Sequence, residues 1–301
     1  MPSEPLTRVL VTGGAGFIGR RVVRALLAAG YLVTVVDHQV FPDPAVRSVT
    51  GDICDSGVCE AAVTDDTSAV IHLAAVTSVL RSVEDPVITH RVNVDVTARL
   101  LELSREHNVE SFLLASTNAV TGNAGSAVIS ETTPLRPLAP YGATKAAAEM
   151  LLSAYSSSYG IKGAALRFST VYGPGMESKD SFILRLMRAA RDSHGVEIRG
   201  DGTMTRDFAH VDDLVRGIFA VWRSEHTGPV ILGSGTSVSV LDMVEAARAV
   251  TGRPIPVTHV PAGDAEMPAV ILDISLARSL GYNPRMSLAE GLKTVWPEFR
   301  Q

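Results

Sequence analysis

The chain has 301 residues, of which 46% are hydrophobic and 20% are charged. This composition excludes an intrinsically disordered chain, and the length corresponds to about two structural units. The net charge of −5 argues against a basic nucleic-acid-binding surface. Two cysteines cannot form a disulfide framework, and the N-terminus lacks the apolar core of a signal peptide, so we expect a cytoplasmic protein with no membrane association.

Short apolar runs alternate with longer helical patterns through the first half of the chain. The predicted strands are 9–11, 32–36, 46–50, 69–74, 111–115 and 163–166, and the predicted helices are 20–29, 87–106 and 141–159. Apolar strands that alternate with helices are typical of a parallel sheet covered on both faces. The predicted fold class is therefore α/β, with a Rossmann-type doubly wound parallel sheet.

The pattern loosens after residue 168. Turn residues occur at 173–175, helices are predicted at 182–191 and from about 211 and 241, and an apolar run at 230–232 predicts another buried strand. Ser239 and Asp242 have the spacing of a capping box. We therefore expect a sheet domain over residues 1–168, joined by a strand near 229–233, and a smaller C-terminal α/β lobe over residues 169–301.

Three glycines, Gly13, Gly16 and Gly19, stand directly between the first predicted strand and the first helix. Small residues there allow a tight turn and a close approach of the backbone to a pyrophosphate at the helix N-terminus. Asp37, at the end of the second strand, would accept hydrogen bonds from both ribose hydroxyls and repel a 2′-phosphate, which favours NAD over NADP. A glycine-rich turn with an incidental aspartate is the alternative, against which the flanking strand and helix argue.

Two further residues near the predicted strand ends are open to structural interpretations. Asp52, after the third strand, could meet an adenine amino group or form a turn with Gly51. His72 lies within an apolar run, which favours a packed core histidine over a ligand or base.

Tyr141 and Lys145 are four residues apart and share one face of a predicted helix. A phenol with a pKa near 10 is a poor base at neutral pH. A neighbouring ammonium and a nicotinamide cation both favour the phenolate, so the pair could carry out acid–base chemistry beside NAD.

With these motifs the chain resembles the extended short-chain dehydrogenase/reductase superfamily, specifically its NAD-dependent nucleotide-sugar epimerase/dehydratase family and the UDP-glucose and UDP-glucuronate 4-epimerases. The resemblance covers nearly the whole chain, with matching segments at 12–19, 37, 51–53, 72–75, 92–94, 115–117, 140–145 with 149, 166–167, 171–175, 200–202, 206–208, 210–213 and 281–282. It implies a UDP-sugar 4-epimerase that acts through a transient 4-keto sugar. It also implies a homodimer that packs helices near 93–106 and 141–157 into a four-helix bundle.

The resemblance assigns roles to individual residues. Tyr141 would be the catalytic acid/base, Lys145 would bind the nicotinamide ribose and lower the tyrosine pKa, and Thr117 would hydrogen-bond the reacting hydroxyl. The implied cofactor contacts are Gly13, Gly16, Phe17, Ile18, Gly19, Asp37, Asp52, Ile53, Leu73, Ala74, Ala75, Asn93, Tyr141 and Lys145. The implied substrate contacts are Thr77, Ser78, Thr117, Asn118, Thr170 and Arg206, and we expect no metal site.

One departure from the family pattern narrows the reaction. Asn118 and Ala119 stand where sugar 4,6-dehydratases have Asp-Glu and where UDP-glucuronate decarboxylases usually keep a Glu. Neither side chain exchanges a proton at neutral pH. This favours epimerisation over dehydration or decarboxylation. A net NAD-dependent dehydrogenase or reductase of a sugar or hydroxy substrate is the alternative.

The residues expected to hold a diphosphate match the family only in part. Arg206 fits one family arginine, although an ion pair with Asp207 or Asp201 would also explain it. The family's later Arg-Pro-Gly-Asp pattern reads Pro-Ala-Gly-Asp at 261–264, so Pro261 replaces the second arginine. Candidates to compensate are Lys179, Arg185 and Arg188. Thr77 and Ser78 could equally be loop-capping hydroxyls.

Overall fold

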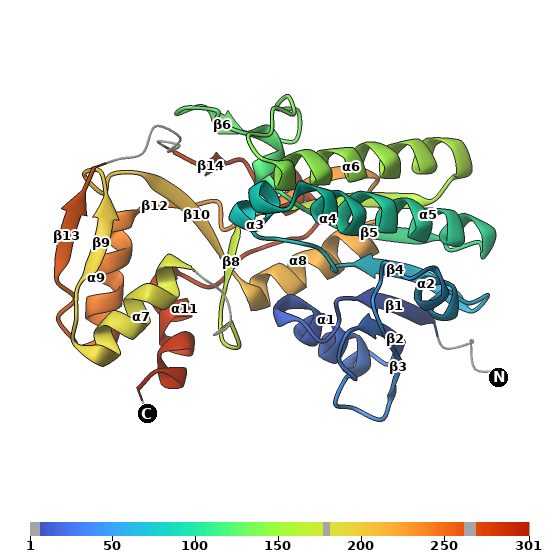
Figure 1. Ribbon diagram of the computed structural model, residues 1–301, viewed down its shortest axis with the longest axis horizontal. Helices are drawn as coiled ribbons and strands as arrows, with labels where there is room; N and C mark the ends of the chain where they lie inside the picture. The colour runs from blue at the N-terminus through green and yellow to red at the C-terminus, as the bar shows by residue number, and fades with distance from the viewer. Residues whose placement is uncertain (1–6, 177–180, 262–268, 301) are drawn as a thin grey trace.

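A seven-stranded parallel sheet organises the molecule, as seen in a computed structural model that describes residues 7–176, 181–261 and 269–300 (Figure 1). Its strands are β1 (Arg8–Thr12), β2 (Leu32–Asp37), β3 (Val46–Thr50), β4 (Thr67–His72), β5 (Ser111–Thr117), β7 (Lys162–Phe168) and β11 (Gly228–Leu232). They lie in the order β11-β7-β5-β4-β1-β2-β3. The predicted α/β fold class with a doubly wound parallel sheet is confirmed.

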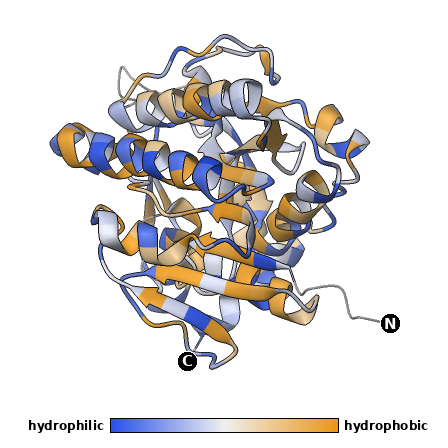
Figure 2. Cartoon of the chain, turned by 90° about the vertical axis from the view of Figure 1, so that its right-hand side faces the viewer, coloured by the Kyte–Doolittle hydropathy of each residue, from blue (hydrophilic) through white to orange (hydrophobic). Residues whose placement is uncertain are grey.

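Helices cover both faces of the sheet because successive residues of each strand point to opposite sides. Val9 and Val11 of β1 pack in a core that includes α1 and α8, whereas Leu10 packs in the core with α5 and α6. One face is covered by α1 (Phe17–Ala28), α8 (Val211–Arg223) and α10 (Ser275–Ser279), and the other by α2 (Ser56–Ala62), α5 (Val96–Glu106) and α6 (Pro140–Tyr159). The sheet strands are correspondingly apolar, and the outer helices carry mixed faces (Figure 2).

The second half of the chain builds a lobe beside the sheet (Figure 1). Its core contains side chains of α7 (Phe182–Asp192), α9 (Val240–Thr251) and α11 (Leu288–Val295). Its strands are β8 (Thr170–Tyr172), β10 (Thr205–His210) and β12 (Ser237–Ser239) in one sheet, and β9 (Val196–Arg199) with β13 (Val257–Val260) in another. The predicted capping box of Ser239 and Asp242 begins α9.

The chain returns from this lobe to the main sheet. The strand expected near 229–233 is β11, which pairs in parallel with β7 at the sheet edge, and α8 packs in the same core as α1. A short pair, β6 (Val128–Ile129) and β14 (Ile271–Leu272), makes a second connection. No helix within the described ranges is long and apolar enough to span a membrane.

The single helix predicted over 87–106 is wrong in one respect. The structure divides it into α4 (Pro86–His90), a π-helical turn η1 (Arg91–Asp95) and α5, and a further helix α3 (Val79–Glu84) precedes them. Asn93 lies in the π-turn, where its Oδ1 accepts from Val76 N (2.9 Å) and its Nδ2 donates to Thr144 Oγ1 (3.1 Å). A wider turn re-aims one side chain without disturbing the apolar pattern on either side, so the sequence pattern did not reveal it.

His72 is a core histidine, as its apolar surroundings in the sequence predicted. It is fully buried between two threonines, with Nδ1 at 2.7 Å from Thr12 Oγ1 and Nε2 at 3.1 Å from Thr97 Oγ1. Burial lowers the pKa of His72 to about 3. The neutral ring therefore ties β1 and β4 to α5 at neutral pH.

His72 should make the protein acid-sensitive. An unfolded histidine titrates near pH 6.5, so between about pH 6.5 and 3 the unfolded chain binds a proton that folded His72 rejects. As the pH is lowered through this range, His72 should reduce the free energy of unfolding by up to about 1.4 kcal/mol per pH unit. His72→Gln should show a shallower fall in urea titrations from pH 6.5 to 4, and His194→Gln, on the surface, should not. Identical slopes in His72→Gln and the parent protein would contradict this account.

Candidate functional site

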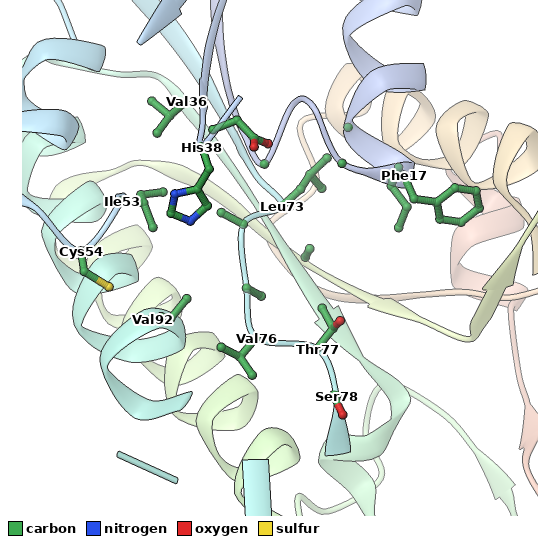
Figure 3. Close-up of a pocket in the computed structure, with 18 of the residues that line it drawn as sticks. Phe17, Val36, His38, Ile53, Cys54, Leu73, Val76, Thr77, Ser78 and Val92 are labelled. Atoms are coloured by element: carbon green, nitrogen blue, oxygen red, sulfur yellow. The ribbon is translucent and has the colours of Figure 1, made fainter. Parts of the chain in front are cut away.

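A cavity of about 610 Å³ opens at the carboxyl ends of the sheet strands, where the strand order reverses between β1 and β4 (Figure 3). In open α/β sheets this is the position at which ligands bind. The cavity brings together Gly13, Gly16, Phe17, Ile18, Gly19, Asp37, Asp52, Ile53, Leu73, Ala74, Ala75, Thr77, Ser78, Tyr141 and Lys145, which the sequence assigned to the site. Residues from five separate segments of the first half thus line one space.

The glycine loop lies unusually close to the neighbouring backbone. Gly13 has φ +69°, and a Cβ there would lie 2.9 Å from the Ala74 amide nitrogen. A Cβ on Gly19 would collide with the Gly13 carbonyl oxygen. Gly16 is the N-cap of α1 and offers no side-chain acceptor, so the amides of the first helical turn remain available for an anion at the cavity.

Two carboxylates stand at the strand ends beside this loop. Asp37 Oδ2 accepts from Ala15 N (3.0 Å) and its Oδ1 accepts from Gln39 N (3.3 Å), which orients the carboxylate in the cavity. Asp52 Oδ1 accepts from Cys54 N (2.9 Å), which lowers the Asp52 pKa, so the turn interpretation holds even though Asp52 also lines the cavity. Figure 3 shows Ile53 and His38 at one end of the cavity and Phe17 at the other.

Tyr141 and Lys145 lie one turn apart at the start of α6. Burial lowers the pKa of Lys145 to about 8, and the charge of Glu149 opposes that fall. Burial raises the pKa of Tyr141, and a hydrogen bond with the Thr117 hydroxyl opposes the rise. Lys145 is therefore mainly an ammonium at pH 7, whereas the Tyr141 phenolate needs a further positive charge beside it.

The N-terminus of α6 is held against the end of β5. A Cβ on Gly142 would lie 2.7 Å from the Ala119 carbonyl oxygen, so glycine permits this approach. Ser82 Oγ on α3 accepts from the Tyr141 amide (3.1 Å), which is otherwise without a helical partner in the first turn. These contacts keep Thr117, the last residue of β5, beside Tyr141.

Some sequence-predicted residues lie elsewhere. Asn93 is buried and does not line the cavity, but it bonds the Val76 backbone and Thr144 of α6, which agrees with its expected role of holding the helix and the cofactor region in place. Among the described residues, Asn118, Thr170 and Arg206 do not line this cavity, and neither does Thr117, although its hydroxyl hydrogen-bonds Tyr141, which does. Ser78 lines it and also caps α3, since its Oγ accepts from Arg81 N (3.2 Å). Two predicted substitutes for the missing arginine are not in the lining either, because Arg185 stacks on Phe182 and Arg188 lies on the same helix. The third, Lys179, falls outside the described residues.

Sequence reasoning gave no role to several residues in the lining. These are Val36, His38, Gly51, Cys54, Val76, Arg81, Ile88, Val92, Ala115, Ser116 and Phe168. Most stand within a few residues of a predicted site residue, so their position after a strand was the available signal. Arg81, three residues after Ser78, lines the cavity because α3 folds beside it. The described part of the chain contains no cluster of three potential metal ligands.

A model of the NAD-dependent epimerase/dehydratase family matches residues 9–233. The chain belongs to this family. This match confirms the resemblance inferred from the motifs. It also confirms the prediction of NAD as the cofactor. The glycine loop, the helix N-terminus and Asp37 form a cradle that fits this cofactor.

Relatives in the NAD-dependent epimerase/dehydratase family include proteins named for different reactions. A putative UDP-glucose 4-epimerase of Methanocaldococcus jannaschii is 33% identical over 95% of this chain and 96% of its own. A dTDP-glucose 4,6-dehydratase of Streptomyces griseus is 36% identical over 95% of this chain and 92% of its own. The crystal structure of Thermotoga maritima UDP-glucose 4-epimerase with UDP-glucose superposes with a TM-score of 0.91 at 31% identity, covering 97% of this chain and 98% of that one.

The close approach at Gly13 gives a stability prediction. Gly160 has a similar backbone angle, φ +74°, but a Cβ there would meet nothing within 4 Å. Gly160→Ala should therefore cost only the left-handed backbone strain, about 1 kcal/mol. Gly13→Ala should cost at least about 2 kcal/mol more, because the new methyl group must displace the Ala74 backbone. Denaturant unfolding of both variants checks this, and equal losses would refute the close-approach argument.

Proposed function

We propose that this family member is an NAD-dependent 4-epimerase of a UDP-sugar. The observation that carries the proposal is the meeting of Thr117, Tyr141 and Lys145 beside a cavity with a cofactor cradle. An enzyme that regenerates its own cofactor needs one reversible acid–base group at the reacting hydroxyl, and Tyr141 supplies it. Residues 169–301 form the proposed substrate lobe, in which Arg206 is the candidate diphosphate contact.

In the proposed reaction, Tyr141, Lys145 and Thr117 together move the proton of the sugar 4-hydroxyl. When bound, NAD supplies the hydride acceptor and donor and the positive charge that favours a phenolate. Tyr141 takes the proton from the 4-hydroxyl of the sugar. It returns the proton after the 4-keto sugar has rotated and received the hydride on its other face. The Lys145 ammonium favours the phenolate and binds the nicotinamide ribose, while the Thr117 hydroxyl orients the reacting group.

Dehydration is disfavoured in this proposal, although the S. griseus relative is named as a dehydratase. Removing water from a sugar requires an acid and a base in addition to Tyr141. The chain continues from Thr117 with Asn118 and Ala119, neither of which transfers a proton at neutral pH. The backbone carbonyl oxygen of Asn118 accepts a hydrogen bond from the Thr121 hydroxyl (2.8 Å) in the short helix η2 (Asn118–Thr121).

The purified enzyme, mixed with UDP-glucose, UDP-N-acetylglucosamine or UDP-glucuronate, should yield a 4-epimer without added NAD. Tyr141→Phe should lower kcat by about 100-fold or more, because the proton acceptor is removed. Tyr159→Phe, an exposed residue at the other end of α6, is the matched control and should keep full activity.

Chromatography of the products, together with absorbance at about 340 nm, distinguishes this proposal from its alternatives. Stoichiometric NADH absorbance would identify a net dehydrogenase, and a 4-keto-6-deoxy product would identify a dehydratase. Either result, or conversion of none of the three sugars, would contradict a 4-epimerase of these substrates.

We also propose a cytoplasmic homodimer in which α5 and α6 of two subunits form a four-helix bundle. The two helices lie side by side (Figure 1), and a shallow groove of about 490 Å³ lies between α4 and α6. Exposed apolar side chains gather on these and the neighbouring segments, namely Val83, Val87, Leu138, Met150 and Tyr159. The thiols of Cys54 and Cys59 are unpaired, which suits a reducing compartment.

Light scattering at micromolar concentration should report a dimer. Met150→Glu places a charge on α6 at a side chain that is 68% exposed, and it should shift the protein to monomer. Val40→Glu makes the same change at a 67% exposed site on the β2–β3 connection and should leave the dimer intact. A monomeric parent protein would rule out the bundle.

A further inference from the structure

We propose that Glu149 is a positioning residue for Lys145: its carboxylate, fixed by Ser116 and Arg167, keeps the lysine an ammonium ion. Glu149 lies one helical turn beyond Lys145 on α6, and so on the same face. The inference rests on the proposed function, because it concerns the charge that supports Tyr141 as an acid–base group.

The Glu149 carboxylate is held by several donors at once. Arg167 Nη2 donates to Oε2 (2.7 Å), and Arg167 Nε donates to Oε1 (3.1 Å) and Oε2 (3.2 Å). Ser116 Oγ donates to Oε1 in a short hydrogen bond. Both ions are buried, with Glu149 8% and Arg167 3% exposed. The carboxylate consequently has one orientation.

The guanidinium is anchored in turn by parts of the chain that are far apart. Arg167 Nη1 donates to the Glu131 carbonyl oxygen (3.0 Å). The Glu131 side chain accepts from the Ile231 amide (2.9 Å) on the edge strand β11. Burying two ions costs desolvation energy, and an apolar pair of similar volume often stabilises a fold equally well. A buried ion pair held by several hydrogen bonds in this place therefore suits an electrostatic role.

Ser116 connects the ion pair to the cofactor cavity. Ser116 lines the cofactor cavity immediately before Thr117. Glu149 and Arg167 line a second cavity, of about 480 Å³, with residues of α6, β7 and β11. The ion pair thus lies outside the lining of the cofactor cavity, one helical turn along α6 from Lys145, which lines it. Burial alone drives Lys145 toward its neutral form, and the Glu149 charge opposes this.

Other charged groups around α6 do not replace Glu149. His72 of β4 interacts with Lys145 but is neutral at working pH, and Tyr141 is uncharged without a cation beside it. Arg81 on α3 lines the cavity and would oppose a second positive charge. The remaining charges on elements packed against α6 are at the surface or bonded to a neighbour. They are Glu84, His90 with Asp95, Arg91, Arg99 with the Cys54 carbonyl, Glu102 and Glu106 with Arg105, and Lys162 with Glu225.

Competitive acylation measures the lysine directly. The chain contains four lysines, 145, 162, 179 and 293, so labelled peptides are readily assigned by mass spectrometry. In the parent protein Lys145 should label with a midpoint near pH 8. Glu149→Gln should move that midpoint down by about one pH unit, because the stabilising charge is removed. The alkaline limb of the kcat profile should move with it, and the exposed Lys293 should not change.

Two further variants keep the result interpretable. Glu102→Gln removes a carboxylate that is also paired with an arginine, Arg105 of α5, but on the surface, and should leave the Lys145 midpoint in place. Glu149→Gln leaves Arg167 buried without its partner, so it could fail to fold. The double variant Glu149→Gln/Arg167→Met removes both charges and should show the same downward shift.

An unchanged Lys145 midpoint in a folded Glu149→Gln or double variant would overturn the inference, even if kcat fell. A downward shift in either variant supports it. The labelling uses no sugar, so failure of the parent protein to epimerise UDP-sugars would count against the proposed function and not against the charge coupling.

Discussion

The site depends on the close packing of α6 against the end of β5. Gly142 allows the helix to approach the Ala119 carbonyl, and Ser116 binds Glu149 two turns further along the same helix. Between these two ties, Tyr141 reaches Thr117 and Lys145 reaches the cofactor cavity. Acid–base chemistry at a positioned hydroxyl is sensitive to misplacement of about 1 Å, so the packing of α6 matters for the proposed reaction.

Burial creates the electrostatic problem that the surrounding groups solve. It pushes Lys145 toward its neutral form and Tyr141 toward its protonated form, and both changes oppose the proposed chemistry. The Glu149 carboxylate and the Thr117 hydroxyl counter these effects from within the protein. In the proposed mechanism, the positive charge of NAD would add to these effects and favour the Tyr141 phenolate.

Membership of the family establishes the cofactor and the scaffold more firmly than the reaction, because its members include proteins named as epimerases and as dehydratases. The proposed function therefore rests on the residues that follow Thr117. Asn118 and Ala119 offer no second proton donor or acceptor, which is the chemical reason for preferring epimerisation.

The sequence by itself determined the features that depend on local spacing. The glycine turn, Asp37 at a strand end and the Tyr141–Lys145 pair were all predictable, because each is set by a short segment in a recognisable strand or helix. Tertiary structure alone decided that Asn93, in a π-helical turn, lies outside the cavity lining, that Arg206 and Thr170 also lie outside it, and that Arg81 enters it. It also decided that Arg167 and Ser116, from two different strands, converge on Glu149. Such contacts join residues distant in sequence, and their geometry depends on how helices pack on the sheet, which no local pattern records.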